Sequence, residues 1–363
     1  MIESITLQNF RNLQGNYLPT TGINLIVARN GAGKSNFLDA IYHLSRGKSF
    51  RTIAEGNAIN WDSSLPFARI ESHISGSKKL ALILSQLEGQ NRKRFEVDGS
   101  PKKRLTFVSN IITVLFAPQD LDIVSGSPDI RRAEIDDFLS QSSKVYEENL
   151  REYKQVIVRR NKLLQRIAER KANEKELKFW DEKLVESGTG LIKMRYDTLN
   201  RFAPSVIKYS NDLFAGEIGN LRIEYLSRFA DSPEADNIAD EFLSTIIKGR
   251  VKELAAGRTL YGPHRDDLNI VFDNRPIRIF GSRGQQRIAA LIIKFAMLKY
   301  LSENNQQSPI LLLDDIMSEL DPKHRHNLEE FIQELGTQCF ITGTDESQFS
   351  RNFMGKNNNL RLQ

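Results

Sequence analysis

A lysine and a serine stand side by side at positions 34 and 35, directly after a glycine-bearing segment, in NGAGKS. Backbone N–H groups in such a turn form a concave anion nest, and the following helix points its positive end at the same place. Lys34 would reach the β- and γ-phosphates of a nucleotide, and the Ser35 hydroxyl would hold Mg²⁺. We therefore interpret eight residues as a nucleotide-binding loop: Ala28, Arg29, Asn30, Gly31, Ala32, Gly33, Lys34 and Ser35.

This loop departs from the usual pattern G-x-x-x-x-G-K-[ST] at its first position, which is Ala28. An alanine there costs little if its φ is negative and about 1 kcal/mol if its φ is positive. The donors and ligands lie downstream, in residues 30–35, so we expect nucleotide binding to survive. The alternative is a glycine-rich turn between a strand and a helix that binds no ligand.

Two adjacent carboxylates follow an apolar run in SPILLLDDIMSELD, residues 308–321. Mg²⁺-dependent NTPases present a second metal ligand in this way, here Asp314, beside a carboxylate that orients the attacking water, here Asp315. The alternative is a plain strand-to-helix turn, because Asp321 followed by Pro322 is typical of a helix N-cap.

A second candidate anion site lies in FGSRGQQR, residues 280–287, where Ser282 and Gly284 come just before an amphipathic helix. Plain N-capping by the serine is the alternative. One chain seldom needs two helix-terminus phosphate sites for one nucleotide. A dimer resolves this, with each nucleotide held between the loop of one subunit and the serine turn of the other.

The elements that position these residues alternate between strand and helix at both ends of the chain. We expect strands at 2–8, 23–28, 67–75, 79–87, 93–98, 220–229, 268–273, 309–314 and 338–342, and helices at 235–256, 284–303 and 321–335. A helical pattern covers 131–215, with a break expected at Gly188 and Gly190, and the asparagine-rich residues 356–359 are expected to fray. This order predicts an α/β core lobe, residues 1–115 plus 258–363, divided by a mainly helical lobe, residues 116–257.

Composition limits the classes of protein to consider. The 363 residues are 40% apolar and 27% charged, which suits a globular chain of two lobes. No apolar run approaches the roughly 18 residues that span a bilayer, and MIESITLQNF lacks a signal-peptide layout, so we expect a cytoplasmic protein without a membrane partner. A single cysteine, Cys339, excludes an internal disulfide framework. The net charge of +5 favours an anionic partner without proving one.

Taken together, the motifs resemble the RecF family of bacterial recombination mediators, whose ATPase heads are like those of SMC proteins. The matching segments are LQNFRNL (7–13), NGAGKSNFLDAIY (30–42), GKSFR (47–51), FAPQDLDIVSGSPDIRR (116–132), RNKLL (160–164), YGPHRDDL (261–268), GSRGQQR (281–287) and LLLDDIMSELD (311–321). The GPHRDD and DDxxSELD blocks are specific to this family, and the phosphate loop is not. A transporter ATPase subunit and a non-catalytic DNA-binding scaffold are the rival interpretations.

The resemblance implies a P-loop, ABC-type ATPase head with an inserted, mainly helical second lobe. The helical block of about 85 residues would reach only about 60 Å as two antiparallel helices, which excludes the long coiled coil of SMC proteins. Walker A would be residues 28–35, and the signature motif would include Ser282, Gly284 and Gln285.

Further roles follow from the same resemblance. Gln119 would lie near the metal and the attacking water, so that Asp315, Lys34 and Gln119 form the catalytic group, with Ser35 and Asp314 as Mg²⁺ ligands. Arg11 resembles a residue near the nucleotide, with a surface arginine as the alternative. Thr342 or Thr344 stands where cassette ATPases place a residue that senses the γ-phosphate. Arg283 replaces a more familiar neutral residue of the signature.

As to function, the resemblance implies an ATP- and Mg²⁺-dependent homodimer with weak, DNA-stimulated ATPase activity in recombinational gap repair and replication-fork maintenance. It would bind double-stranded and single-stranded DNA near gaps, and would help RecR, and indirectly RecO, to place RecA on SSB-coated strands. The segment RKRFEVDGSPKKR, residues 92–104, is predicted to be a hairpin that contacts DNA phosphates, with a solvated basic surface as the alternative. Its cations are Arg92, Lys93, Arg94, Lys102, Lys103 and Arg104.

Overall fold

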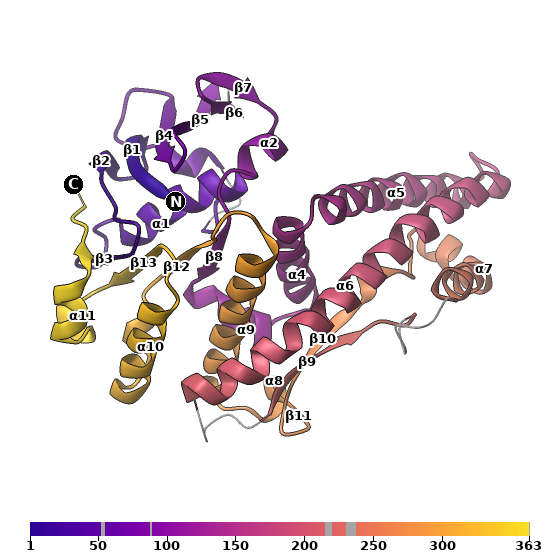
Figure 1. Ribbon diagram of the computed structural model, residues 1–363. Coiled ribbons are helices and arrows are strands. Elements are labelled where there is room, and N and C mark those ends of the chain that lie inside the picture. Colours follow the sequence, from indigo (N-terminus) through magenta and orange to yellow (C-terminus); the bar gives the residue numbers. More distant parts are fainter. Residues whose placement is uncertain (52–54, 88, 215–219, 230–236, 363) are drawn as a thin grey trace. The chain divides into compact units, whose positions relative to one another are not determined.

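The computed structural model describes residues 1–51, 55–87, 89–214, 220–229 and 237–362. Residues 215, 235 and 236 of the expected helices therefore lie outside the described residues. The chain forms two compact units (Figure 1). The first unit comprises Met1–Asp120 and Leu298–Gln363, and the second comprises Leu121–Met297.

A five-stranded parallel sheet forms the centre of the first unit. Its order is β14-β3-β13-β12-β8. The strands are β3 (Ile23–Val27), β8 (Thr113–Phe116), β12 (Ile310–Leu313), β13 (Cys339–Gly343) and β14 (Asn358–Asn359). Its strands read as continuous apolar runs because a parallel sheet is covered on both faces. Accordingly, Leu311, Leu312 and Leu313 have no exposed surface.

An antiparallel sheet of six strands completes the first unit, in the order β2-β1-β4-β5-β6-β7. The strands are β1 (Ile2–Phe10), β2 (Leu13–Tyr17), β4 (Phe67–Ile74), β5 (Lys78–Leu87), β6 (Gln90–Val97) and β7 (Ser100–Lys102). The helices are α1 (Lys34–Arg46), α2 (Arg104–Val108), α10 (Pro322–Glu334) and α11 (Arg351–Lys356), with short turns η1 (Glu55–Ala58), η2 (Pro118–Leu121), η5 (Ile316–Glu319) and η6 (Glu346–Gln348). One hydrophobic core joins α1 to strands of both sheets, which fixes α1 relative to the phosphate loop.

Residues 358 and 359 form a strand, and the expected fraying of residues 356–359 is wrong. β14 pairs in parallel with β3, and Leu360 is buried beyond it. The Asn358 amide donates a 2.8 Å hydrogen bond to the Asn24 side chain, so the asparagines that suggested a loose end anchor it to the sheet.

Helices dominate the second unit. They are α3 (Asp122–Ser125), α4 (Pro128–Ser142), α5 (Lys144–Ala168), α6 (Leu177–Phe214), α7 (Ile238–Ala256), α8 (Ile277–Phe280) and α9 (Arg283–Asn304), with η3 (Glu174–Glu176) and η4 (Pro263–Arg265). The strands β9 (Leu221–Leu226), β10 (Asp267–Phe272) and β11 (Arg275–Pro276) form a separate sheet. Because this sheet belongs to the second unit, that unit ends at Met297, whereas the sequence pattern predicted that the helical lobe ends at residue 257.

Figure 1 shows α5 and α6 lying side by side after a short turn. The predicted break at Gly188 and Gly190 is wrong, because α6 runs through both positions. A Cβ at Gly188 would lie 2.6 Å from the Phe242 ring and 3.1 Å from the Tyr153 ring. The glycine therefore lets aromatic side chains approach the helix, which is a packing role that the sequence pattern does not distinguish from a break.

The YGPHRDD segment, residues 261–267, joins the helices of the second unit through buried polar contacts. His264 Nδ1 lies 2.7 Å from the Tyr153 hydroxyl of α5, and Arg195 of α6 donates to the Pro263 carbonyl at 2.8 Å. Asp266 accepts a hydrogen bond from the Tyr225 hydroxyl of β9. The segment thus has a structural role in the second unit.

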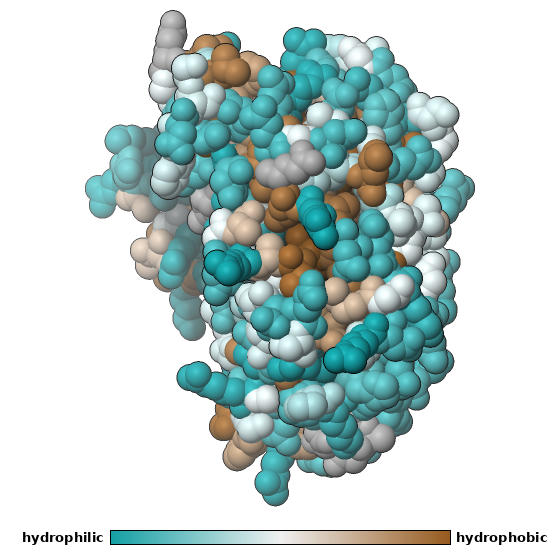
Figure 2. Space-filling view, turned by 90° about the vertical axis from the view of Figure 1, so that its left-hand side faces the viewer, coloured by the Kyte–Doolittle hydropathy of each residue, from teal (hydrophilic) through white to brown (hydrophobic). Residues whose placement is uncertain are grey.

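The face of the molecule that Figure 2 shows is mostly hydrophilic. A smaller hydrophobic area lies near its middle. Within the described ranges, no helix has the length and apolarity that crossing a membrane requires. The large apolar side chains with more than 60% of their area exposed are Leu18, Trp61, Val158, Val251, Ile279 and Phe280.

Candidate nucleotide site

The phosphate loop links the end of β3 to the start of α1. Gly31 and Gly33 have φ angles of +84° and +98°, which glycine adopts without strain. A Cβ at Gly33 would also lie 2.7 Å from the Leu13 side chain. Ala28 is not among the described residues with positive φ, so its side chain imposes no strain on the loop.

Lys34 lies against this loop, with only 7% of its surface exposed. Its ammonium donates to the carbonyls of Ala28 and Arg29 at 2.7 and 3.1 Å. Asn30, Gly31 and Ala32 are exposed, so the apex of the loop is open to an approaching anion. The arrangement combines a held cation with an accessible turn at a helix N-terminus, which suits a phosphate group.

Asp314 follows β12 and meets α1 at the loop. Its Oδ1 accepts hydrogen bonds from the hydroxyls of Ser35 at 2.9 Å and Thr342 at 2.8 Å. Burial raises the pKa of Asp314, while those two hydrogen bonds and the positive charge of Arg51 act in the opposite direction. A bound cation would further favour the charged carboxylate.

These residues fit Mg²⁺. Neighbouring ligands of an octahedral Mg²⁺ at about 2.0–2.1 Å lie about 2.9 Å apart. Ser35 Oγ and Asp314 Oδ1 have that separation, and both are hard oxygen donors. When bound, Mg²⁺ would neutralise charge on the phosphates of a nucleotide.

One side-chain oxygen of Asp315 accepts no hydrogen bond in the structure. The residue has a φ of +50°, and its backbone N–H donates to Thr342 Oγ1 at 2.8 Å. Its side-chain Oδ1 is buried without a hydrogen-bond partner in the structure. A buried carboxylate oxygen normally has a partner, so this one is suited to accept a proton or a hydrogen bond from a water molecule.

Thr342 supports both aspartates from β13. Its side chain has no exposed surface, and its hydroxyl accepts from Asp315 and donates to Asp314. Of the two threonines considered as γ-phosphate sensors, Thr342 is therefore a buried support for the carboxylates. Thr344 bonds instead to the Gln348 side chain.

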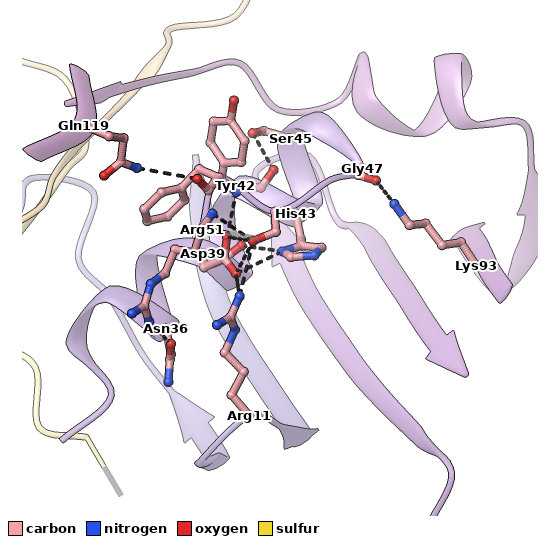
Figure 3. A network of polar contacts seen from close by, with 12 residues as sticks. Arg11, Asn36, Asp39, Tyr42, His43, Ser45, Gly47, Arg51, Lys93 and Gln119 are labelled. Atoms are coloured by element: carbon pink, nitrogen blue, oxygen red, sulfur yellow. Dashed lines mark hydrogen bonds and ion pairs between the residues drawn. The ribbon is translucent and has the colours of Figure 1, made fainter. Parts of the chain in front are cut away.

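Gln119 approaches the segment that contains Arg51, since its side chain lies beside the neighbouring Phe50 (Figure 3). Gln119 is exposed in η2, and its amide Nε2 lies 3.5 Å from the Phe50 carbonyl. Arg51 donates to the side chain of Asn36, which follows Ser35 on α1. Sequence reasoning did not assign Arg51. Its place in the matching segment GKSFR was the only signal that could have found it.

Arg11 is neither a surface arginine nor a free cation. It pairs with the fully buried Asp39 of α1 at 2.6 Å, as Figure 3 shows. The same carboxylate accepts from Ser49 Oγ at 3.0 Å and from the Phe50 N–H at 3.0 Å. The pair therefore fixes the segment that precedes Arg51 against the middle of α1.

The serine turn belongs to the second unit, where it starts α9. Ser282 Oγ accepts from the Gln285 N–H at 3.2 Å, and the Gln285 side chain accepts from the Ser282 N–H at 2.9 Å. This reciprocal cap satisfies two groups of the helix start. Ser282, Arg283 and Gly284 remain exposed.

The basic hairpin forms as predicted from β6 and β7, but its cations do not act alike. Lys93 donates to the Gly47 carbonyl at 2.6 Å (Figure 3), and Arg104 donates to the Arg46 carbonyl at 2.8 Å. Both therefore bind the C-terminal end of α1, where positive charge is favourable. The other four cations, Arg92, Arg94, Lys102 and Lys103, are exposed, as Arg104 is too, and Arg94 also pairs with Glu96 at 2.7 Å.

The phosphate loop, the paired carboxylates and the sheet that joins them define the head of an ABC-type ATPase. A family model described as RecF/RecN/SMC N terminal domain matches residues 1–358. The DNA replication and repair protein RecF of Heliobacterium modesticaldum is 34% identical, with 100% of this chain and 96% of that protein covered. RecF of Halothermothrix orenii is also 34% identical, over 95% of this chain and 92% of that one. The chain therefore belongs to the RecF family.

Solved structures agree with this assignment. A structure of the recombination mediator protein RecF-ATP in the RecFOR pathway has a TM-score of 0.87 and 31% identity, covering 96% of this chain and 93% of that one. The Smc head bound to the C-winged helix domain of ScpA has a TM-score of 0.58 and 16% identity, covering 100% and 96%. This second likeness concerns the fold alone.

Proposed function

We propose that this protein is an ATP-dependent DNA-binding protein of recombinational gap repair and replication-fork maintenance. An ATP-induced homodimer binds double-stranded and single-stranded DNA near gaps, hydrolyses ATP slowly with stimulation by DNA, and helps RecR and RecO to load RecA onto SSB-coated DNA. The observation that carries the proposal is the meeting of Ser35, Asp314 and Asp315 beside Lys34.

Those residues account for the chemistry of hydrolysis. Lys34 and the open loop bind phosphates, Ser35 and Asp314 hold Mg²⁺, and Asp315 orients the attacking water. Gln119, exposed in the same unit, assists at the water. The non-catalytic scaffold is disfavoured because the residues that hydrolysis requires, Lys34, Ser35, Asp314 and Asp315, are all present and Ser35 contacts Asp314.

The names of the relatives support the biological part of the proposal. RecF proteins at 34% identity are named for DNA replication and repair, and a solved relative is titled a recombination mediator with ATP. The exposed cations Arg92, Arg94, Lys102 and Lys103 supply contacts to DNA phosphates, and the chain carries a net charge of +5.

Sedimentation and phosphate release test the proposal together. The wild-type chain should sediment as a dimer with ATP, bind gapped duplex DNA in that state, and release phosphate. Lys34→Ala should lose ATP binding and hydrolysis, whereas the exposed Lys356→Ala, in the same unit, should behave as wild type. A wild-type chain that neither dimerises with ATP nor hydrolyses it would refute the proposal.

Mixing two variants tests the shared site. Ser282→Arg should bind ATP as a monomer but neither dimerise nor hydrolyse it. In a mixture with Lys34→Ala, one site of the mixed dimer has an intact lysine facing an intact serine. ATP-dependent dimerisation should therefore reappear, with turnover unless both sites must be filled. No recovery at any ratio would show that each chain uses its own serine turn.

A further inference from the structure

Two large apolar side chains lie exposed immediately before the serine turn. Ile279 and Phe280, the last residues of α8, have 64% and 62% of their area exposed. Scattered exposed apolar residues are normal, so exposure by itself does not define a binding surface. The position of this pair is what distinguishes it, because Ser282 is the next exposed residue after Phe280.

Gln286 holds the pair and the serine turn together. Its side chain is 9% exposed, and its Nε2 lies 3.3, 3.4 and 3.2 Å from the carbonyls of Ile277, Arg278 and Gly281. The Gly281 N–H also donates to the Ile277 carbonyl at 2.8 Å. These bonds join α8 to the start of α9, so Ile279 and Phe280 keep a fixed position relative to Ser282.

The surroundings of the pair are cationic. Arg275, Arg278 and Arg283 are exposed, and the Arg275 guanidinium lies 5.9 Å from the centre of the Phe280 ring. Among the residues that the structure describes, no carboxylate forms an ion pair with any of these three arginines. In the proposed dimer this surface faces the phosphate loop of the other copy, which also carries cations, Arg29 and Lys34. The two surfaces repel each other unless an anion lies between them, and the triphosphate held by the loop supplies that anion.

We propose that Ile279 and Phe280 form an apolar contact with a second copy of this chain, beside the ATP that the two copies share. The inference rests on the proposed function, since it requires the ATP-dependent dimer. It adds the residues that complete the contact around the serine turn. It also explains why dimerisation depends on ATP, because the arginines around the pair need an anion before the apolar side chains can approach the partner.

A single thiol can report this contact. Cys339 is fully buried, and burial raises the pKa of its thiol well above the ordinary value, so it reacts poorly with maleimide. Ile279→Cys and Phe280→Cys each add one accessible thiol, and Val251→Cys on α7, where 78% of the valine is exposed, is the matched control. At protein concentrations that give a dimer, ATP should slow labelling of the first two at least tenfold and leave the control unchanged.

A second measurement compares the dimer Kd of the wild type with that of a variant that lacks the two apolar side chains. The double variant Ile279→Ser/Phe280→Ser should keep its melting temperature and ATP affinity but raise the dimer Kd about 10–100-fold. Ile247→Ser/Val251→Ser, which removes an exposed apolar pair of 59% and 78% exposure from α7, should leave the dimer Kd unchanged.

The outcomes separate this inference from the proposed function. If the cysteine variants dimerise with ATP as the wild type does, but their new thiols still label at the monomer rate, the inference is overturned and the proposed function stands. Protection that does not depend on protein concentration, or that duplex DNA produces without ATP, also overturns it in favour of a ligand or nucleic-acid contact. No wild-type dimer with ATP removes the proposed function and this inference with it.

Discussion

Ser35 and Asp314 are 279 residues apart in the chain, yet their side-chain oxygens lie 2.9 Å apart at the start of α1. The parallel sheet creates this meeting, since β3 and β12 both pair with β13 and all three run in the same direction. The residues that follow two such strands lie at one edge of the sheet, where ligands of α/β folds bind.

Thr342→Val should weaken Mg²⁺-dependent hydrolysis roughly 10–100-fold, because the lost hydroxyl holds Asp314 and the backbone of Asp315. Thr342→Ser keeps the hydroxyl and should retain most of the activity. A Mg²⁺ titration of phosphate release measures the effect. Equal Mg²⁺ dependence of the valine and serine variants would show that this hydroxyl does not position the carboxylates.

Asp315→Asn should slow hydrolysis about 10²–10⁴-fold while ATP affinity changes little, because the amide keeps the shape but cannot accept the proton of the attacking water. Single-turnover phosphate release and equilibrium ATP binding separate the two quantities. The ATP-dependent dimer should last correspondingly longer. If the variant turns over ATP at the wild-type rate, then Asp315 does not act at the water.

Ala28→Gly should change ATP affinity by less than about tenfold, or 1.4 kcal/mol. Ala28 does not have a positive φ, so glycine relieves no strain there. Equilibrium binding of a fluorescent ATP analogue, with competition by ATP, is the measurement. A gain of two orders of magnitude would mean that the natural loop is impaired.

Arg92, Arg94, Lys102 and Lys103, changed together to Ser, should reduce the slope of log K against log salt for duplex DNA. Each lost phosphate contact removes about 0.9 from the slope. The melting temperature should change little, because all four side chains are exposed and the ion pair of Arg94 with Glu96 lies at the surface on the arginine side. An unchanged slope would remove the hairpin from the DNA interface.

Lys93→Met and Arg104→Met should show the opposite pattern to those four cations. Each loses a hydrogen bond to the last carbonyls of α1, so the free energy of unfolding should fall by about 1–2 kcal/mol. Their effect on the salt slope should be small. Urea denaturation beside DNA titrations tests this, and a salt slope reduced without loss of stability would place both cations on DNA instead.

His264 and Asp266 should give the second unit opposing pH dependences. Burial lowers the pKa of His264 to about 4 and raises the pKa of Asp266 to about 6. The unfolded chain binds more protons at His264 between about pH 4 and 6.5, so this group makes stability rise with pH. The folded chain binds more protons at Asp266 between about pH 4 and 6, so this group makes stability fall with pH.

The two contributions to the free energy of unfolding nearly cancel in the wild type, and each changes by about 3 kcal/mol across its pH window. His264→Gln should make stability fall as pH rises from 4 to 6, and Asp266→Asn should make it rise more steeply. Urea denaturation midpoints at several pH values report this. If the two variants had the same pH dependence of stability, His264 and Asp266 would not act in opposite directions.

Local signals correctly placed a glycine-bearing turn between β3 and α1 and two carboxylates directly after β12. Both patterns lie within short stretches of the chain. Contacts between distant segments were not predictable in this way. The pairing of Arg11 with Asp39 depends on how β1 packs over α1, and no local pattern marks it. Gly188 looks the same in sequence whether it ends a helix or admits the Phe242 ring.

In the hairpin, the sequence likewise did not predict which cations bind the protein itself and which remain exposed. Six cations within thirteen residues predict a basic surface, and five of them are exposed. Lys93 and Arg104 reach carbonyls of α1 that are 46 and 58 residues away. Side-chain direction along a strand alternates, but which face meets a helix end is decided by the tertiary structure.

The strand order β14-β3-β13-β12-β8 has a consequence for the chain as it leaves the ribosome. β3 and β8 are made early, but β13 and β12 lie between them, and β12 begins at Ile310. At about 5–20 residues per second, the roughly 200 residues between β8 and β12 take about 10–40 s to synthesise. During that time the edges of β3 and β8 have no partner strands, so the nascent N-terminal segment is exposed to mispairing until synthesis is nearly complete.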